Sequence, residues 1–263
     1  ATPPSGGGTL LEQVNKLTGS KRQKFSPDGN AKDFQLLETD ITSVDWVKIN
    51  GVVQTPTTHY TFNLTTGKIT FVNTPPAGTN TVEIQWTKGT GDRETITKQR
   101  FAEMYSGYTD NRVFLYGDGT NKAYYSGLDE HGQPSAEYFP DLNVLNVGEE
   151  NTPITSMIRH FAKLMVFKTD SAHLIHYDAI TLEDGTVTAG FYVRNIDKDT
   201  GNVAPGQVRL INNYPVSLHG NSVYRWSLLY SSGVQDERAA SRISDRVRET
   251  LSGMNLTNAV TFD

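Results

Sequence analysis

Two histidines separated by two residues, His173 and His176, are the first side chains that could do chemistry. Imidazole nitrogens bind zinc and other transition metals, provided that both rings point toward the same ion. The surrounding residues 164–177 have the pattern of a hairpin, and residues three apart on a strand point to opposite faces of a sheet. We therefore expect neither a metal nor another cofactor here, and interpret the pair as polar residues flanking the buried Leu174 and Ile175.

Pairs of carboxylates are the second candidates, because a glycoside hydrolase needs two of them about 5 to 10 Å apart across a cleft. Three loops rich in Gly, Pro and Asn carry such pairs, which are Asp129 with Glu130, Glu149 with Glu150, and Asp197 with Asp199. Acids are common in surface loops of this composition. The sequence therefore favours a protein that is not an enzyme, with a catalytic pair among these acids as the alternative.

Other motifs with chemistry are incomplete. Residues 118–121 and 197–202 resemble parts of a calcium loop but lack the terminal Glu of the twelve-residue motif. No serine sits in a Gly-x-Ser-x-Gly turn, and no phosphate-binding loop is present. These observations point away from calcium loops of the twelve-residue type, serine hydrolases and nucleotide-binding loops.

Aromatic side chains give a better functional signal. Six of them are concentrated in a stretch otherwise rich in Gly, Asp and Ser, namely Tyr105, Tyr108, Tyr124, Tyr125, Tyr138 and Phe139. Exposed aromatics among polar residues suit a protein interface or a platform for sugars. We expect some of the six to be core residues and the others to contact a partner protein or a host glycan.

A basic stripe lies on the one segment with helical periodicity, residues 236–251. Asp236 is a suitable N-cap, Gly253 follows the end, and apolar residues recur every four positions at 239, 243, 247 and 251. Arginines recur with the same spacing at Arg238, Arg242 and Arg246. The stripe is a candidate for lining a DNA passage or binding an acidic neighbour, but four acidic residues balance the four arginines of the segment, which favours a solvated face.

Composition limits the class of protein. The chain has 263 residues, no cysteine and a net charge of -5, so it has no basic field to hold DNA, which we expect only in passage. Its apolar runs are far shorter than the ~20 residues of a membrane-spanning helix, so we expect no membrane insertion. Residues 1–20 begin with a Pro- and Gly-rich stretch that we interpret as a flexible linker, and both ends of the chain suggest a fragment of a longer protein.

Residues 21–88 predict a small immunoglobulin-like β-sandwich. Apolar residues alternate with polar ones in six or seven short runs, and Asn50 with Gly51 is a strong hairpin signal. Residues 89–97 are polar and predict a linker.

Residues 98–263 predict an incomplete propeller-like β domain that ends with the helix 236–251. A hairpin recurs about every 50 residues, at 113–126, 164–176 and, more degenerately, 217–226. Residues 152–162 fit either a strand or a short turn. The sequence as a whole is therefore expected to be all-β with one short C-terminal helix.

These runs resemble known phage proteins. Four segments of residues 21–88 resemble a β-sandwich module of bacteriophage tail fibres and tail proteins. They are VKINGVVQT (47–55), YTFN (60–63), TGKITF (66–71) and PPAGTNTVEI (75–84). A second set of segments resembles the propeller part of phage tail-tip proteins of the nozzle type. These segments are NRVFLYG (111–117), YYS (124–126), YFPD (138–141), VG (147–148), LMVFK (164–168) and residues 223–247.

The resemblance implies a virion structural protein. Such a protein would be assembled in the host bacterial cytoplasm, form a cyclic homo-oligomer around the tail channel, and contact neighbouring tail proteins. Its sandwich would project outward. The alternative function is a receptor-facing glycan-binding module or a polysaccharide depolymerase, which would use the aromatics and the loop carboxylates.

Overall fold

A computed structural model describes residues 13–106, 111–128, 133–181, 187–231 and 234–261. Within these residues the chain forms five antiparallel sheets and only short helices, so the all-β prediction is confirmed. None of the described helices has the length and apolar character needed to cross a membrane. The chain divides into two compact units, the first made of Ala1–Thr97 with Glu137–Leu142 and the second of Lys98–Ala136 with Asn143–Asp263.

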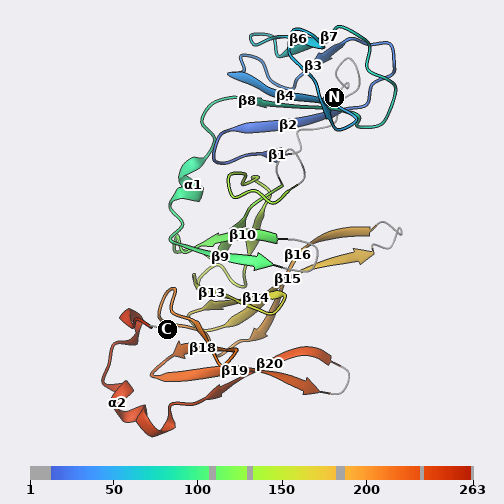
Figure 1. Cartoon of the computed structure of the whole chain (residues 1–263). Helices are drawn as coiled ribbons and strands as arrows, with labels where there is room; N and C mark the ends of the chain where they lie inside the picture. The colour runs from blue at the N-terminus through green and yellow to red at the C-terminus, as the bar shows by residue number, and fades with distance from the viewer. Residues whose placement is uncertain (1–12, 107–110, 129–132, 182–186, 232–233, 262–263) are drawn as a thin grey trace. The chain divides into compact units, whose positions relative to one another are not determined.

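The first unit contains two sheets (Figure 1). The five-stranded sheet has the order β1 (Gln13–Val14), β2 (Ser20–Phe25), β8 (Val82–Thr87), β4 (Ser43–Ile49) and β5 (Val52–Val53). The three-stranded sheet has the order β3 (Asp33–Gln35), β7 (Lys68–Phe71) and β6 (Tyr60–Asn63). Buried positions alternate along β7 and β8, as expected of strands with one face on a core.

The core of this unit lies between its two sheets, which makes it a β-sandwich. Phe34 packs edge-on against both Phe25 and Phe71, with ring centroids 5.3 Å apart in each pair. Such T-shaped contacts stabilise aromatic cores beyond simple area burial. Val47, Ile84, Trp86 and other alternating residues complete the cluster. The more specific immunoglobulin-like topology stays a prediction.

Two tight turns set the register of the sandwich strands. Asn50 and Gly51 have φ of 51° and 78° and join β4 to β5, which confirms the predicted Asn-Gly hairpin. Gly67 joins β6 to β7 with φ of 67°, and a Cβ there would lie 2.0 Å from the carbonyl oxygen of Glu38. Only glycine combines a positive φ with the absence of a Cβ that this close approach of the Glu38 carbonyl requires.

Two predicted linkers contain ordered structure. The linker assignment of residues 1–20 is wrong for residues 13–20, because β1 pairs with β2 and the buried Asn15 accepts a hydrogen bond from the N–H of Phe139 at 3.1 Å. The order of residues 13–20 was not predicted from their polar composition, because hydrogen bonds rather than apolar contacts hold the segment in place. Residues 89–97 contain the short helix α1 (Arg93–Thr97).

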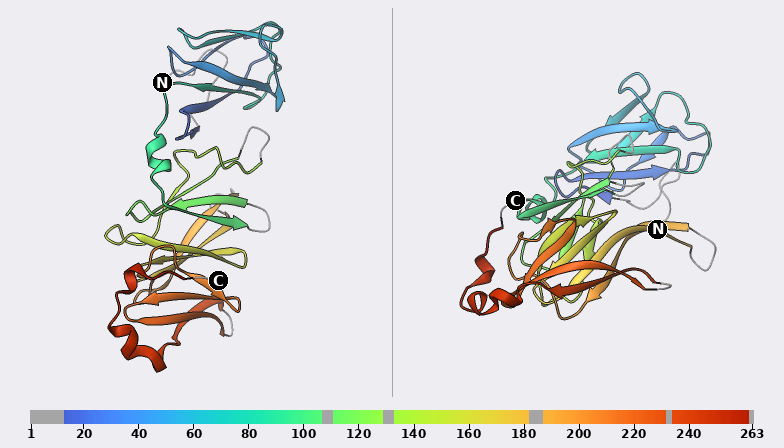
Figure 2. Two further views of the ribbon diagram at one scale, coloured as in Figure 1. Left: turned by 60° about the vertical axis from the view of Figure 1, so that its left-hand side comes forward. Right: turned by 60° about the horizontal axis from the view of Figure 1, so that its bottom comes forward.

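The second unit consists of three successive four-stranded antiparallel sheets, stacked one on another in Figures 1 and 2. The first contains β9 (Phe101–Ser106), β10 (Asn111–Tyr116), β11 (Lys122–Tyr125) and β12 (Val144–Asn146). The second contains β13 (Ile154–His160), β14 (Lys163–Lys168), β15 (Ala172–Thr181) and β16 (Val187–Asp197). The third contains β17 (Arg209–Ile211), β18 (Tyr214–His219), β19 (Ser222–Ser231) and β20 (Val234–Arg242).

In each of these sheets the strands pair in chain order. The three hairpins predicted from the recurring pattern are the middle strand pairs β10–β11, β14–β15 and β18–β19, and are confirmed. The ambiguous residues 152–162 contain the strand β13. Closure of the sheets into a propeller stays a prediction.

The second sheet is buried on both of its faces. From β14, Leu164 and Val166 pack in a cluster with Phe114 of the first sheet. The alternate residues Met165 and Phe167 pack in a cluster with Trp226 of the third sheet. Burial on both faces explains why the segment 164–167 is continuously apolar rather than alternating.

The predicted helix 236–251 is wrong over most of its length. Residues up to Arg242 form β20, which pairs with β19 and completes the third sheet. Only η1 (Asp245–Val247) and α2 (Arg248–Ser252) are helical, α2 ends at Gly253 as expected, and η2 (Leu256–Asn258) follows. Pairing with a neighbouring strand outweighs a local four-residue periodicity, because the strand contacts are tertiary.

Candidate functional site

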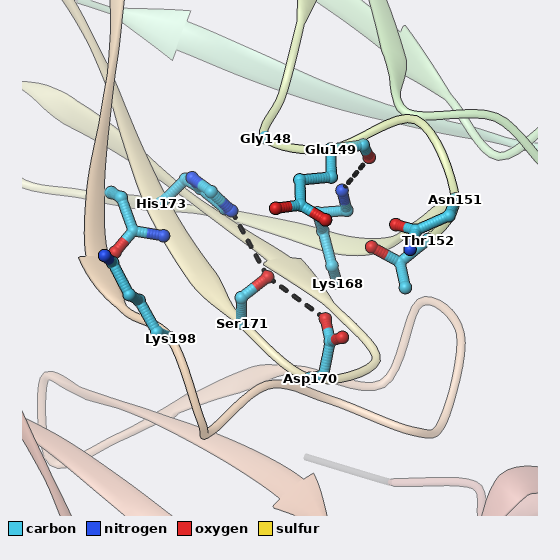
Figure 3. Close-up of a pocket in the computed structure, with 10 residues that line it drawn as sticks. Gly148, Glu149, Asn151, Thr152, Lys168, Asp170, Ser171, His173 and Lys198 are labelled. Carbon is cyan, nitrogen blue, oxygen red and sulfur yellow. Dashed lines mark hydrogen bonds between the residues drawn. The ribbon is translucent and has the colours of Figure 1, made fainter.

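A polar pocket of about 240 Å³ lies at one end of the second sheet (Figure 3). Three segments of the second unit contribute to it: the connector between β12 and β13, the turn between β14 and β15, and the end of β16. Its lining residues are Gly148, Glu149, Asn151, Thr152, Lys168, Asp170, Ser171, His173, Asn195 and Lys198. Almost all of them carry a polar group, which distinguishes the pocket from the apolar cores on either side of the sheet.

Lys168 forms the floor of this pocket and is only 1% exposed. Its Nζ donates a hydrogen bond to the carbonyl oxygen of Glu149, and its backbone N–H donates to Ser171 across the turn at 2.9 Å. A Cβ on Gly148 would lie 3.3 Å from Nζ, so glycine lets the connector approach closely. Burial lowers the pKa of Lys168 below its ordinary value.

His173 lies beside Lys168 and is 3% exposed. Burial, and then the positive charge of Lys168, lower the pKa of His173 to about 4, so the imidazole is neutral at neutral pH. Its Nε2 is 3.3 Å from Oγ of Ser171, and that hydroxyl is 3.2 Å from Oδ1 of Asp170 (Figure 3).

These three residues do not have the geometry of a catalytic triad. In a triad the carboxylate lies behind the histidine and orients it, whereas the carboxylate here contacts the serine. The hydroxyl of Ser171 donates its hydrogen to Asp170, so it is not held for transfer to His173. His173 and His176 both lie on the strand β15, as predicted. Three residues apart, they point to opposite faces of the sheet.

The rim of the pocket is exposed and carries charges of both signs. Glu149 and Asp170 supply carboxylates, and Lys198 supplies an ammonium group on the other side. In the part of the chain that the structure describes, the side chains of Glu149, Asn151 and Lys198 form no hydrogen bond or ion pair with another residue. The rim therefore has hydrogen-bonding capacity directed at solvent or a ligand.

The other predicted acids have different positions. Asp129 and Glu130 lie outside the described residues. Asp197 caps its own loop, because its Oδ1 accepts hydrogen bonds from the N–H groups of Asp199 and Thr200 at 2.9 and 2.7 Å. Asp118 likewise accepts the N–H of Thr120 at 3.0 Å. These two acids stabilise turns by bonding to the backbone, which is a common role of Asp in loops.

Four of the six aromatic residues proposed for contacts are core residues, as expected for part of the set, and are not available to a partner. Tyr105, Tyr124, Tyr138 and Phe139 are all less than 8% exposed. Tyr125 packs beside the core, with its ring stacked on that of Phe114. Tyr108 lies outside the described residues.

The aromatic side chains are buried because each has neighbours distant in sequence. The hydroxyl of Tyr105 accepts the N–H of Tyr177, in the second sheet, at 3.2 Å. In the first unit, the ring of Tyr138 lies under the guanidinium group of Arg22, 4.4 Å from its centroid. The sequence did not indicate these partners, and local composition alone suggested exposure.

The arginine stripe does not exist as predicted. Arg238 and Arg242 belong to the strand β20, whereas Arg246 belongs to η1. Arg242 forms an ion pair with Asp245. The three residues therefore do not share one helical face, and the stripe required the helix that the strand replaces.

Lys168 and Asn202 are the residues that sequence analysis missed. Asn202 is fully buried between the second and third sheets, where its side chain bonds to Ser156 and to the N–H of Leu218. The signal for Lys168 was a single lysine directly after the apolar run 164–167. Asn202 appeared only as the last residue of the incomplete calcium-loop fragment 197–202, which gave no sign of its burial.

Comparison with protein families finds no family model that matches this chain, and comparison with curated proteins finds no matching sequence.

Proposed function

We propose that this chain is a non-enzymatic structural protein of a bacteriophage tail. In this proposal it assembles with copies of itself into a ring around the tail channel, contacts neighbouring tail proteins, and is put together in the bacterial cytoplasm. Support comes from the resemblance of its spaced motifs to phage tail proteins. The observation that carries the proposal is the succession of three four-stranded sheets stacked face to face, the arrangement expected of propeller blades.

The outer face of the third sheet supports self-association. Trp226 and Ser217, which are bonded to each other at 2.9 Å, lie on the inner face. The opposite face carries Ile211, Val216, Leu218 and Val223 around a groove of about 260 Å³. Ile211 is 54% exposed, and an exposed apolar surface of this kind favours contact with another protein. We propose that a sheet of a second copy covers it, in a head-to-tail contact that closes into a ring.

The test is the mass of the intact protein in solution, measured by light scattering and native mass spectrometry. We expect a closed oligomer that Ile211→Glu dissociates. Val52→Glu, a change at another exposed apolar residue (65% exposed) in the first unit, is the control and should leave the oligomer intact. A monomer at high concentration would refute ring assembly. Finding the chain by mass spectrometry in purified phage particles tests the virion assignment separately.

The alternative of glycan binding by exposed aromatic residues has less support, because four of the six aromatic side chains considered for it are buried. A depolymerase would need loop acids, of which Glu149 lies at the polar pocket. Release of sugars from host capsule by the purified protein, abolished by Glu149→Gln, would contradict a non-enzymatic role.

A further inference from the structure

The polar pocket has donors and acceptors that the protein itself leaves unused. The Nζ of Lys168 carries three hydrogens, of which one is bonded to the carbonyl of Glu149. No other described residue accepts a hydrogen bond from this Nζ, and the side chain lines the pocket. A buried ammonium group with unfilled hydrogen bonds is costly unless water or a ligand supplies acceptors. Lys168, at the floor of the pocket, can therefore donate hydrogen bonds to a bound ligand.

The charges around the pocket select the kind of ligand. Lys168 and Lys198 can only donate hydrogen bonds, whereas the carboxylates of Glu149 and Asp170 can only accept them. The four formal charges cancel, and burial keeps the fifth ionisable residue, His173, neutral at neutral pH. A simple anion would meet two carboxylates, and a simple cation would meet two ammonium groups. Neighbouring hydroxyl groups, which both donate and accept, satisfy all four.

The size of the pocket limits the ligand further. Its volume of about 240 Å³ lies just below the ~300 to 1,000 Å³ of pockets for drug-sized molecules. At roughly 30 Å³ per water molecule, it corresponds to about eight waters. This space accommodates one sugar ring.

We propose that this pocket binds a single neutral monosaccharide through its hydroxyl groups. Among the described residues, no Phe, Tyr or Trp lines the pocket, so the sugar is held mainly by hydrogen bonds at its edge rather than by stacking on a large ring. The exposed rim residues would contact the outer hydroxyls, and Lys168 the innermost one. The site is independent of the tail function proposed above and lies in the second unit alone.

The test is a titration of the full ¹⁵N-labelled chain with D-glucose, D-galactose and N-acetylglucosamine, followed by amide chemical shifts. At least one of these sugars should give saturable shifts confined to residues 148–152, 168–173 and 195–198, with a Kd in the millimolar range expected for so small a ligand. Inorganic phosphate should leave these amides unmoved. If the methyl glycoside binds equally well, the natural ligand is the terminal sugar of a glycan, and if it does not bind, the ligand is the free sugar.

Two substitutions at the rim test whether the sugar binds in this pocket. Glu149→Gln and Lys198→Met should each weaken sugar binding by about fivefold, the effect of losing one solvent-exposed charged hydrogen bond. Glu150→Gln and Lys122→Met change exposed residues outside the lining and should leave binding unchanged. All four sites are exposed, and the same spectra report whether each variant is folded. Absence of shifts with every sugar, binding of phosphate in their place, or sugar binding unaffected by both rim variants would overturn the proposal.

Discussion

Replacing Asn202 by alanine tests whether one buried side chain joins the second and third sheets. Asn202 is fully buried in the loop between β16 and β17. Its amide nitrogen donates to Oγ of Ser156 at 3.0 Å and to the carbonyl oxygen of Ala204 at 2.5 Å. Its Oδ1 accepts the N–H of Leu218 at 3.1 Å. Ser156 belongs to β13 and Leu218 to β18, so the side chain bonds to both sheets.

The expected cost follows from the groups left behind. In Asn202→Ala the N–H of Leu218 loses its acceptor, whereas the carbonyl of Ala204 keeps the N–H of Gln207 at 3.2 Å. Each buried polar group left unsatisfied costs ~1 to 3 kcal/mol. The fully buried Oγ of Ser156 loses the amide donor of Asn202 and is the second group left with an unfilled hydrogen bond. We expect the free energy of unfolding of the second unit to fall by about 3 kcal/mol, a large share of the ~5 to 15 kcal/mol typical of a domain.

Urea unfolding combined with hydrogen-exchange mass spectrometry measures this loss. Peptides from β13 and β18 should exchange faster in Asn202→Ala, and the amide of Leu218 should lose its protection. Asn143→Ala is the matched control, because Asn143 is half-buried and its side chain makes a single hydrogen bond with the described residues, to the carbonyl of Ser126 at 3.3 Å. A loss below ~1 kcal/mol for Asn202→Ala, or an equal loss in the control, would refute the argument.

Three further predictions concern single residues. Tyr116→Phe removes the acceptor of the N–H of Met157, 3.0 Å away and buried, and should cost about 2 kcal/mol in urea unfolding of the second unit. Gly67→Ala should destabilise the first unit by more than ~2 kcal/mol, whereas Gly51→Ala, with φ of 78° and no atom within 4 Å of a Cβ, should cost only ~1 kcal/mol. Because the pKa of His173 is about 4 when folded and 6.5 when unfolded, the unfolded chain binds more protons between these values. Stability of the second unit should therefore fall as pH decreases through this window, by up to ~3 kcal/mol, and His173→Gln should abolish that component in thermal unfolding measured from pH 7.5 to 4.

Features of the fold that depend on neighbouring residues were predictable from sequence. The hairpin at Asn50 and Gly51 follows from the positive φ that these residues tolerate. The hairpins at the centres of the three sheets follow from short apolar runs separated by turn residues. In each case the strands are adjacent in the chain, so a local pattern contains the information that sets the pairing.

Features that depend on distant strands were not predictable. The four-residue periodicity of residues 236–251 is real, but Ile243 and Val247 are each 51% exposed, so no core selects a helical face there. What decides the conformation is the exposed edge of β19, to which residues up to Arg242 add as a strand. A pattern within one segment contains no information about a partner strand elsewhere, and tertiary pairing therefore overrides it.

The polar pocket, too, depends on contacts between distant segments and could not be identified from the sequence. Lys168 follows an apolar strand and precedes a turn, a place where lysine is normally solvated. Its burial arises because Gly148, 20 residues earlier, lets the connector pass within hydrogen-bonding reach of Nζ. That connector also brings Glu149 to face Lys198 across the pocket. The lining residues form a binding pocket only because three separate segments of the chain meet in the fold. Within any one of these segments they look like ordinary loop residues, so a motif search does not single them out.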